Sequence, residues 1–313
     1  MKAWQLTAVG EPLRLIERDD PRPGPGQVVI DVRAAGICHS DVGFADGTLT
    51  PMLPGLPMIL GHEVAGVVAD IGPDVTTVHP GDRVVIAGPE DFAPGWAVDG
   101  GFADKCLARA DGLLTVPDNV GFAQAATATD AGQTAYGAVM GAGELRKGQR
   151  VGIVGLGGLG MTGARIAVIE GAEVYAADPK PGTWAPAKDR GVLEVVDDVQ
   201  KLGAYNLDLI VDFAGFGTTT AGAINAVRPG GLVVQVGLGV LEATISTAAL
   251  VVKPATLRGS RGGRPGDTDA VLRHMATGAL EIQTNTIGFD DIPHAIERLA
   301  TGDVIGRFVA VPD

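Results

Sequence analysis

A cysteine, a histidine and an aspartate in the first 130 residues carry atoms that could hold a metal ion. Cys38 lies in the run Gly-Ile-Cys-His-Ser-Asp, His62 lies in Gly-His-Glu, and Asp130 follows much later. A thiolate, an imidazole and a carboxylate are ordinary ligands of Zn²⁺, and three protein ligands leave the fourth tetrahedral position open, as in catalytic sites. These residue types therefore indicate metal-assisted chemistry.

The only other cysteine, Cys106, is a rival third ligand. It does not form a CxxC pair with Cys38, which excludes zinc fingers and ribbons. The ligands of a catalytic site are commonly gathered from distant strand ends and loops, so wide spacing does not argue against either candidate. Asp130 and Cys106 both stay open on the residues alone.

The elements that must position these residues follow from the local patterns. Cys38 comes after a strand-like apolar run at 27–35, and His62 precedes another at 64–68, with loops rich in proline and glycine between them. From about residue 132 the pattern changes to alternating strands and helices, which predicts a parallel sheet. We therefore expect an α/β protein with a β-rich domain at 1–131, completed by 265–313, and a doubly wound domain at 132–264.

A glycine-rich turn opens the second domain. Strand-like residues 150–154 lead into Gly-Leu-Gly-Gly-Leu-Gly, a helix is expected at 158–169, and the next strand ends before Asp178. Such a turn admits a pyrophosphate at the helix N-terminus, and an acidic residue about 20 positions later can accept hydrogen bonds from a ribose. Since a carboxylate repels a 2′-phosphate, Asp178 favours NAD over NADP, although Lys180 and Lys188 could offset that repulsion.

Taken together, these motifs resemble the zinc-containing medium-chain alcohol dehydrogenases over essentially the whole chain. The resemblance rests on Gly-Ile-Cys-His-Ser-Asp at 36–41, Gly-His-Glu-x-x-Gly at 61–66, Gly-Asp-Arg-Val at 81–84 and the glycine turn. It implies a GroES-like catalytic domain and a Rossmann cofactor domain. It also favours Asp130 as the third ligand, because Asp130 aligns with the second ligand cysteine of many relatives, whereas Cys106 matches a structural strand.

The resemblance assigns further roles residue by residue. Cys38, His62 and Asp130 would bind the metal, Glu63 would lie near it and bind it transiently, and Asp41 would orient His62. Ser40 would hydrogen-bond the reacting alcohol and pass on its proton. The residues implied at the cofactor are His39, Thr134, Gly155, Gly157, Gly158, Leu159, Gly160, Asp178, Val236, Gly237 and Arg307.

Two features of relatives are missing from this sequence. The segment 87–99 contains none of the four cysteines that hold a structural zinc in many relatives, so we expect one catalytic zinc and no structural zinc. A proton-relay histidine that often follows the ligand cysteine by five residues is replaced by Gly43. We expect proton transfer, if relayed at all, to start at Ser40.

Composition narrows the partners and the location. The net charge is −13, from 24 basic and 37 acidic residues, with no basic cluster for nucleic acid and no apolar run long enough for a membrane span or a signal peptide. A cysteine needed as a reduced metal ligand favours the cytoplasm. The resemblance implies a homodimer or homotetramer, with a subunit contact at an edge strand near 241–245.

We therefore expect zinc-dependent hydride transfer between a nicotinamide cofactor and an alcohol, aldehyde or ketone. Phe44, residues 49–53, Trp96, Leu238 and Leu257 are the expected pocket wall, and their apolar character favours hydrophobic or aromatic substrates. Three alternatives stay open: a zinc-dependent polyol or sugar dehydrogenase, a metal-free quinone or enoyl reductase of the same superfamily, and a non-enzymatic dinucleotide-binding protein.

Overall fold

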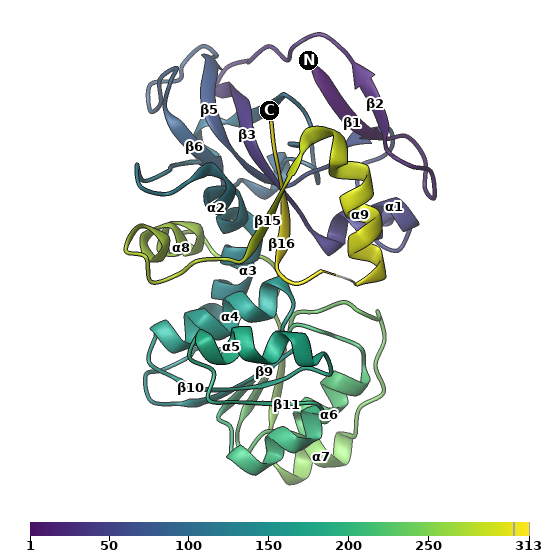
Figure 1. Ribbon diagram of the computed structural model, residues 1–313, viewed down its shortest axis with the longest axis vertical. Coiled ribbons are helices and arrows are strands. Elements are labelled where there is room, and N and C mark those ends of the chain that lie inside the picture. The colour runs from purple at the N-terminus through teal and green to yellow at the C-terminus, as the bar shows by residue number, and fades with distance from the viewer. Residues whose placement is uncertain (303, 313) are drawn as a thin grey trace. The chain divides into compact units, whose positions relative to one another are not determined.

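The structure is a computed structural model that describes residues 1–302 and 304–312, and its chain forms two units (Figure 1). The first unit contains Met1–Asp130 and Gln283–Asp313, and the second contains Ala131–Ile282. Each unit has its own buried apolar core, the first lined by side chains such as Ile30 and Phe102 and the second by side chains such as Leu202 and Ile210. None of the described helices is long and apolar enough to cross a bilayer.

The first unit is built on a seven-stranded sheet in the order β15-β16-β3-β5-β6-β8, with β7 paired to β3. Its central strand, β3 (Gln27–Ile37), pairs antiparallel with β5 (Glu63–Ile71) and with β16 (Arg307–Val311). The remaining strands of this sheet are β6 (Arg83–Ile86), β7 (Lys105–Arg109), β8 (Leu113–Thr115) and β15 (Thr284–Gly288). The pairing of β16 with β3 thus places the C-terminal strand next to Cys38, which directly follows β3.

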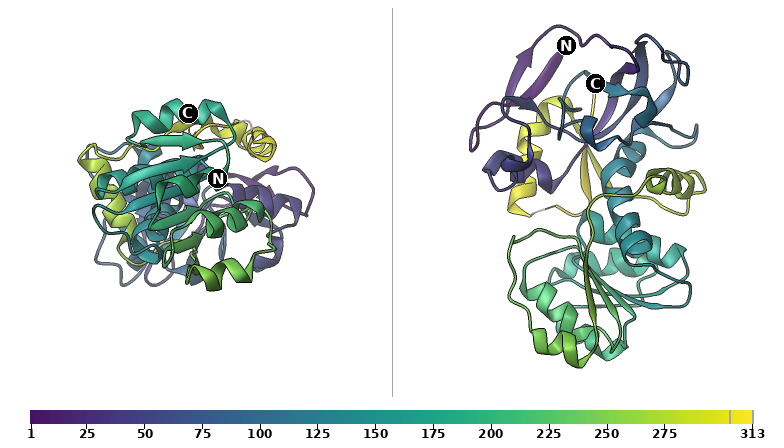
Figure 2. Two further views of the ribbon diagram at one scale, coloured as in Figure 1. Left: turned by 90° about the horizontal axis from the view of Figure 1, so that it is seen from below. Right: turned by 180° about the vertical axis from the view of Figure 1, so that it is seen from behind.

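A smaller sheet and several helices complete the first unit. The sheet contains β1 (Lys2–Leu6), β2 (Arg14–Glu17) and β4 (Met58–Ile59). The helices are α1 (His39–Asp46), α2 (Phe122–Thr127) and α9 (Ile292–Thr301), with short turns η1 (Thr50–Met52), η2 (Glu90–Phe92), η3 (Ala110–Gly112), η4 (Ala128–Gly132) and η8 (Phe289–Asp291). Although they are far apart in sequence, α1 and α9 lie side by side (Figures 1 and 2).

The second unit is a parallel six-stranded sheet in the order β11-β10-β9-β12-β13-β14. Its strands are β9 (Arg150–Val154), β10 (Glu173–Ala177), β11 (Glu194–Val196), β12 (Leu209–Asp212), β13 (Leu232–Gln235) and β14 (Thr256–Gly259). β9 has the bounds that the sequence predicts, and β10 ends directly before Asp178, as expected. The order of the strands reverses direction between β9 and β12, which is the doubly wound arrangement.

Helices cover both faces of this sheet, because right-handed crossovers that leave β9 in opposite directions lie on opposite sides. Figure 1 shows α4 (Gly158–Ile169) and α5 (Trp184–Asp189) on one side, and α6 (Thr218–Ala226) and α7 (Thr247–Val252) on the other. The other helical segments of the unit are α3 (Gln133–Tyr136), η5 (Gly137–Ala142), η6 (Pro181–Thr183), η7 (Val199–Tyr205) and α8 (Asp267–Ala276).

Residues 265–282, expected in the first domain, contact the second unit instead. α8 packs against α3, and the Thr268 hydroxyl donates a hydrogen bond to Gln133 Oε1 at 2.9 Å. The guanidinium of Arg165, in α4, likewise binds the carbonyl of Ala279 at 2.8 Å. The chain therefore returns to the first unit near Gln283.

The expected edge strand near 241–245 is wrong. This segment forms no strand, and Leu241 is 61% exposed. The outermost strand of the sheet on that side is β14, whose paired neighbour in the described sheet is β13. The expectation came from the family resemblance, and the sheet of this chain instead ends at β14 (Thr256–Gly259).

Candidate metal centre and cofactor turn

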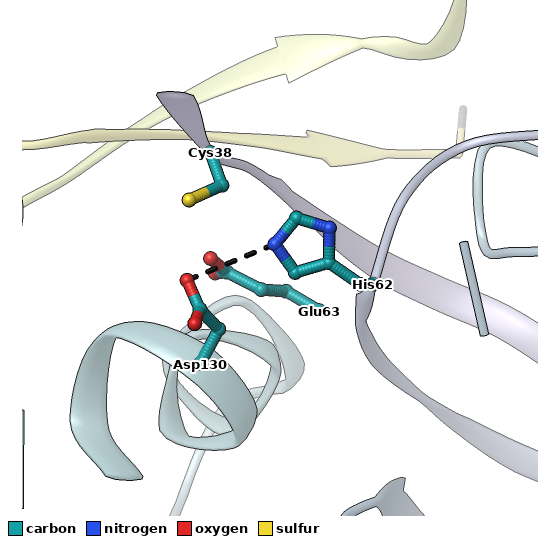
Figure 3. Close-up of side chains that lie close together, drawn as sticks. All are labelled: Cys38, His62, Glu63 and Asp130. Carbon is teal, nitrogen blue, oxygen red and sulfur yellow. Dashed lines mark ion pairs between the residues drawn. The ribbon is translucent and has the colours of Figure 1, made fainter. Parts of the chain in front are cut away.

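Four side chains of the first unit converge on one small volume. One ligand atom each from Cys38, His62, Glu63 and Asp130 lies within 4.8 Å of every other. Figure 3 shows the four side chains turned toward one another from three parts of the chain, with His62 Nε2 3.8 Å from Asp130 Oδ2. The first three residues are buried and Asp130 is partly buried. This cluster contains all three predicted metal ligands and Glu63.

The buried carboxylate of Asp41 links the cysteine and the histidine. Cys38 precedes the first residue of α1, and its backbone N–H donates to Asp41 Oδ2 at 2.8 Å. The other oxygen, Oδ1, lies 3.5 Å from His62 Nδ1. Because Asp41 is fully buried, its position is fixed, and it holds the Nε2 edge of the His62 ring toward the cluster.

Asp130 reaches the cluster from a π-helical turn, η4, which directly follows α2. Wide helical turns of this kind often occur at functional sites. The rival ligand, Cys106, is not in the cluster. It is buried in β7, where its thiol lies 3.6 Å from the Leu107 carbonyl, and burial raises the pKa of Cys106 to about 12. The geometry thus gathers Asp130 and leaves Cys106 in the sheet.

Arg307 also lies at this cluster, which sequence reasoning did not foresee. Its Nε donates to Glu63 Oε1 at 2.7 Å, and its Nη2 donates to Asp130 Oδ2 at 2.5 Å. The side chain is 5% exposed. The resemblance assigned this arginine to the cofactor pyrophosphate, but here it pairs with two carboxylates beside the metal ligands. The signal available was weak, since only the pairing of β16 with β3 brings the C-terminal strand to this place.

Glu63 is fully buried because it packs over a glycine. Gly36 and Glu63 are register partners on β3 and β5. A Cβ added at Gly36 would lie 2.0 Å from Glu63 Oε2, so a larger residue would displace the carboxylate. Arg307 holds the other oxygen, Oε1, at 2.7 Å.

The electrostatics of the cluster follow from its burial and its opposite charges. Burial lowers the pKa of His62, but the carboxylates of Asp41 and Asp130 raise it, and the net pKa lies well above the ordinary value. Burial raises the pKa of Glu63 well above its usual range despite the nearby Arg307. Burial also acts to raise the pKa of Asp130, but His62 and Arg307 outweigh it and hold that pKa well below its usual range.

The cluster has the features expected of a zinc site. His62 Nε2, which faces Asp130, and Glu63 Oε2 are buried without a hydrogen-bond partner among the described residues, whereas His62 Nδ1 faces Asp41 Oδ1 at 3.5 Å. Buried polar atoms of this kind normally have a partner, so each such atom requires an explanation. A divalent ion bound by the sulfur, nitrogen and oxygen donors would provide one, and this donor set suits Zn²⁺.

The surroundings of the cluster contain a hydroxyl and two aromatic rings. Ser40 Oγ lies 3.6 Å from Cys38 Sγ, and Ser40 is only partly buried. The ring of Trp96 packs edge-to-face on His62 at 5.8 Å and on Phe44 at 4.7 Å between centroids. His39, the first residue of α1, is exposed. A hydroxyl and an apolar wall therefore lie next to the expected metal ligands.

The glycine turn of the second unit has three glycines with three different tasks. Gly155 has a positive φ of 83°, which makes the tight turn after β9. Gly157 precedes α4, and a Cβ there would meet nothing within 4 Å, so its backbone is open to a ligand. A Cβ at Gly160 would lie 1.7 Å from the Gly155 carbonyl, so only glycine lets α4 pack this closely. Gly158 and Leu159 begin α4. These are the tasks that a pyrophosphate-binding turn requires.

Asp178 follows β10 and is tied to this turn. Its Oδ2 accepts a hydrogen bond from the Leu156 N–H at 2.6 Å, and its Oδ1 accepts one from the Lys180 N–H at 2.8 Å. The residue is 7% exposed. Each oxygen has a second lone pair for a ribose hydroxyl, so the carboxylate can hold the turn and a ligand together.

The remaining predicted cofactor residues also lie in the second unit. Thr134 is buried in α3. Val236 and Gly237 follow β13 and are partly buried. Leu238 and Leu257, expected in the pocket wall, are 58% and 37% exposed.

Two family models match the chain. The alcohol dehydrogenase GroES-like domain matches residues 24–118, and the zinc-binding dehydrogenase model matches residues 158–277. An alcohol dehydrogenase of Geobacillus stearothermophilus is 32% identical and covers 100% of both chains.

Solved structures of the same kind resemble the whole chain. The alcohol dehydrogenase of Aeropyrum pernix has a TM-score of 0.92 at 27% identity, covering 100% of both chains. The acetophenone reductase of Geotrichum candidum, solved in complex with NAD, has a TM-score of 0.91 at 30% identity, covering 99% of this chain and 96% of the other.

Proposed function

This chain belongs to the zinc-containing medium-chain alcohol dehydrogenase family, and on that premise we propose that it is a zinc-dependent alcohol dehydrogenase or carbonyl reductase. It would transfer a hydride between a nicotinamide cofactor and an alcohol, aldehyde or ketone. The observation that carries the proposal is the convergence of Cys38, His62 and Asp130 around one small volume. The same convergence argues against a metal-free quinone or enoyl reductase, which needs no such ligand set.

Cys38, His62 and Asp130 would hold one catalytic zinc ion, with Glu63 close enough to join them. The bound metal supplies a Lewis acid that polarises the oxygen of the substrate. Asp41 would fix the orientation of His62, and Arg307 pairs with the carboxylates of Glu63 and Asp130. The hydroxyl of Ser40 would accept a proton from a substrate hydroxyl and pass it toward solvent, since Ser40 is partly exposed.

The cofactor would bind to the second unit, with its pyrophosphate at the N-terminus of α4 and its adenosine ribose at Asp178. We propose NAD rather than NADP, because the carboxylate of Asp178 would repel a 2′-phosphate. The backbone bonds to Leu156 and Lys180 support this, since they fix the carboxylate at the end of β10. We also keep the proposal that Arg307 contacts the pyrophosphate, in addition to its bonds to Glu63 and Asp130.

We propose a neutral, hydrophobic substrate. The ring of Trp96, which packs on His62, supports an apolar wall, and the fully buried Phe44 packs behind Trp96. The charge distribution supports a substrate without net charge. Residues 1–130 and 283–313 carry 23 acidic and 10 basic side chains, whereas residues 131–282 carry 14 of each. The first unit therefore bears the whole net charge of −13 and would repel anions at low ionic strength.

We propose a homodimer or homotetramer whose contact includes the open edge of the second sheet. β14 forms that edge, and the nearby Val251 and Val252 of α7 are 77% and 80% exposed. Apolar side chains so exposed are typical of interaction surfaces. Comparing the sedimentation coefficients of the wild type and Val252→Glu tests this contact.

We also propose a cytoplasmic location, which would keep Cys38 reduced for the metal.

The function is tested by a panel of alcohols, aldehydes and ketones with NADH, NADPH and their oxidised forms. We expect turnover with aromatic and aliphatic carbonyl compounds and a higher kcat/KM with NADH than with NADPH. The kcat/KM for benzaldehyde should exceed that for the anionic 4-carboxybenzaldehyde. Raising the salt concentration should reduce this difference in kcat/KM, because salt screens the repulsion. A panel in which only polyols react would favour a polyol dehydrogenase, and no turnover at all would favour a binding protein.

A further inference from the structure

Asp212 is a buried carboxylate that none of the chemistry above uses. It ends β12 and is fully buried. Its Oδ1 accepts hydrogen bonds from the N–H groups of Ala214 and Gly215 at 3.0 and 2.9 Å. Its Oδ2 accepts bonds from the hydroxyls of Thr219 and Thr220 at 2.8 and 3.0 Å. Four donors on one buried carboxylate fix the loop that follows β12.

The same network reaches the next strand. The Thr220 hydroxyl lies 2.9 Å from Gln235 Oε1, and Gln235 Nε2 donates to the Gly237 carbonyl at 2.7 Å. Because a hydroxyl has one hydrogen, Thr220 shares it between Asp212 and Gln235. The main chain follows the same path, since the Asp212 carbonyl accepts bonds from the N–H groups of Val236 and Gly237 at 3.0 Å each.

The loops at the carboxyl ends of β9, β12 and β13 are in direct contact. A Cβ at Gly215 would lie 1.9 Å from the Gly237 carbonyl oxygen, and a Cβ at Gly237 would lie 2.4 Å from the Phe213 carbonyl oxygen. A Cβ at Gly155, in the glycine turn, would lie 2.9 Å from the Ala214 Cβ. The network around Asp212 therefore sets the backbone beside the expected pyrophosphate position.

The position of the loops after β12 and β13 within the sheet indicates which part of a dinucleotide they would face. A doubly wound sheet binds one mononucleotide over each half, and the strand order here reverses between β9 and β12. Asp178, at the end of β10, marks the adenosine half. The loops after β12 and β13 belong to the other half.

We infer that Asp212, Thr220 and Gln235 are positioning residues for the nicotinamide half of the cofactor. They hold residues 213–217 and 236–237 as one wall, and they act through the backbone of these loops without contacting the reacting atoms. This inference rests on the proposed function, because it requires a nicotinamide dinucleotide in the second unit.

The test compares the dissociation constants of NADH and AMP for the intact chain, measured by calorimetry. Thr220→Val removes the shared hydroxyl but keeps the side-chain shape. We expect it to weaken NADH binding about three- to tenfold, the effect of one lost hydrogen bond. AMP binding should stay within about twofold, because AMP occupies only the adenosine half. Thr220→Ser should restore NADH binding.

Thr268→Val is the matched control, since Thr268 is also buried and also donates to a glutamine Oε1 at 2.9 Å, between α8 and α3. It should leave both affinities unchanged. The inference is overturned if Thr220→Val weakens NADH and AMP by the same factor, if it changes neither, or if the control matches it. Wild-type protein that binds AMP but neither NADH nor NADPH would overturn the inference and the proposed function together. The other outcomes of this experiment leave the proposed function in place.

Discussion

The guanidinium of Arg307 lies against the carboxylate of Asp130, with Nη2 2.5 Å from Oδ2, inside a cluster of expected metal ligands. Its Nε holds Glu63 in the same way at 2.7 Å. One buried cation from the last described strand thus pairs with two carboxylates from distant parts of the chain. In the metal-free protein this arginine is the cation that pairs with the fully buried Glu63 and the partly buried Asp130.

Removing that cation should destabilise the metal-free protein strongly. Arg307→Leu leaves the fully buried Glu63 and the partly buried Asp130 without their partner. Breaking a buried pair costs about 3–5 kcal/mol of unfolding free energy. Arg307→Lys keeps the charge and should cost less. Urea unfolding of both variants after chelation measures the difference, and equal stability of wild type and Arg307→Leu would contradict this role.

Substituting the third ligand should separate Asp130 from Cys106. Asp130→Ala should lose most of its bound zinc, whereas Cys106→Ala should keep one zinc per chain, because Cys106 is buried in β7 away from the cluster. Asp130→Cys should retain the metal, since a thiolate is also a zinc ligand. Elemental analysis of the purified variants provides the measurement. Full zinc retention in Asp130→Ala would show that Asp130 is not the third ligand.

The sequence alone predicted the parts of the site that short motifs encode. The turn at Gly155–Gly160 follows a strand and opens a helix as predicted, and its glycines have the close contacts that such a turn requires. Asp130 depended on the resemblance to a family, because nothing in its local pattern distinguishes it from other acidic residues.

The position of Arg307 could not be predicted because it depends on tertiary pairing. β16 pairs with β3 in the register that places Phe308 opposite Ile37, and this sets Arg307 next to the ligand Cys38. The local sequence pattern of β16 does not determine which residues of β3 it pairs with. The bond from the Leu156 N–H to Asp178 was missed for the same reason, since it joins the loops that follow β9 and β10.

Gly36 should tolerate no side chain, because Glu63 occupies the space above it. In Gly36→Ala the added methyl group would lie 2.0 Å from Glu63 Oε2 and 2.9 Å from Glu63 Cβ. We expect a loss of about 1–3 kcal/mol of unfolding free energy, typical of overpacking, together with weaker zinc binding. Gly121→Ala is the control, since a Cβ there meets nothing within 4 Å and φ is −70°. Equal stabilities and zinc affinities of the two variants would refute this account of Glu63.

Asp208 should make part of the stability of the second unit depend on pH. Burial acts to raise its pKa, but the Arg150 N–H and the Arg228 guanidinium, each at 2.8 Å, outweigh it and lower the pKa. A lowered pKa means that the stabilisation is present above the unfolded pKa of about 4 and is lost as the pH falls through the folded value. Asp208→Asn should therefore lose stability at pH 7 and show a shallower decline below pH 4.

The control for this prediction is Asp189→Asn, because Asp189 is an exposed residue near the end of α5. Its acid unfolding curve should follow that of the wild type. Thermal unfolding between pH 2.5 and 7 measures both variants. Parallel pH curves for Asp208→Asn and wild type would show that the bonds of Asp208 contribute nothing to the acid sensitivity.

The central claim is that one metal ion held by Cys38, His62 and Asp130 is required for hydride transfer. Its most direct test is a titration of the chelated protein with Zn²⁺, following carbonyl-dependent oxidation of NADH and, in parallel, binding of NADH. The account predicts that turnover is absent without metal, rises linearly and saturates at one zinc per chain, while NADH binds throughout. Undiminished turnover in the chelated protein, or in Cys38→Ser, would contradict it.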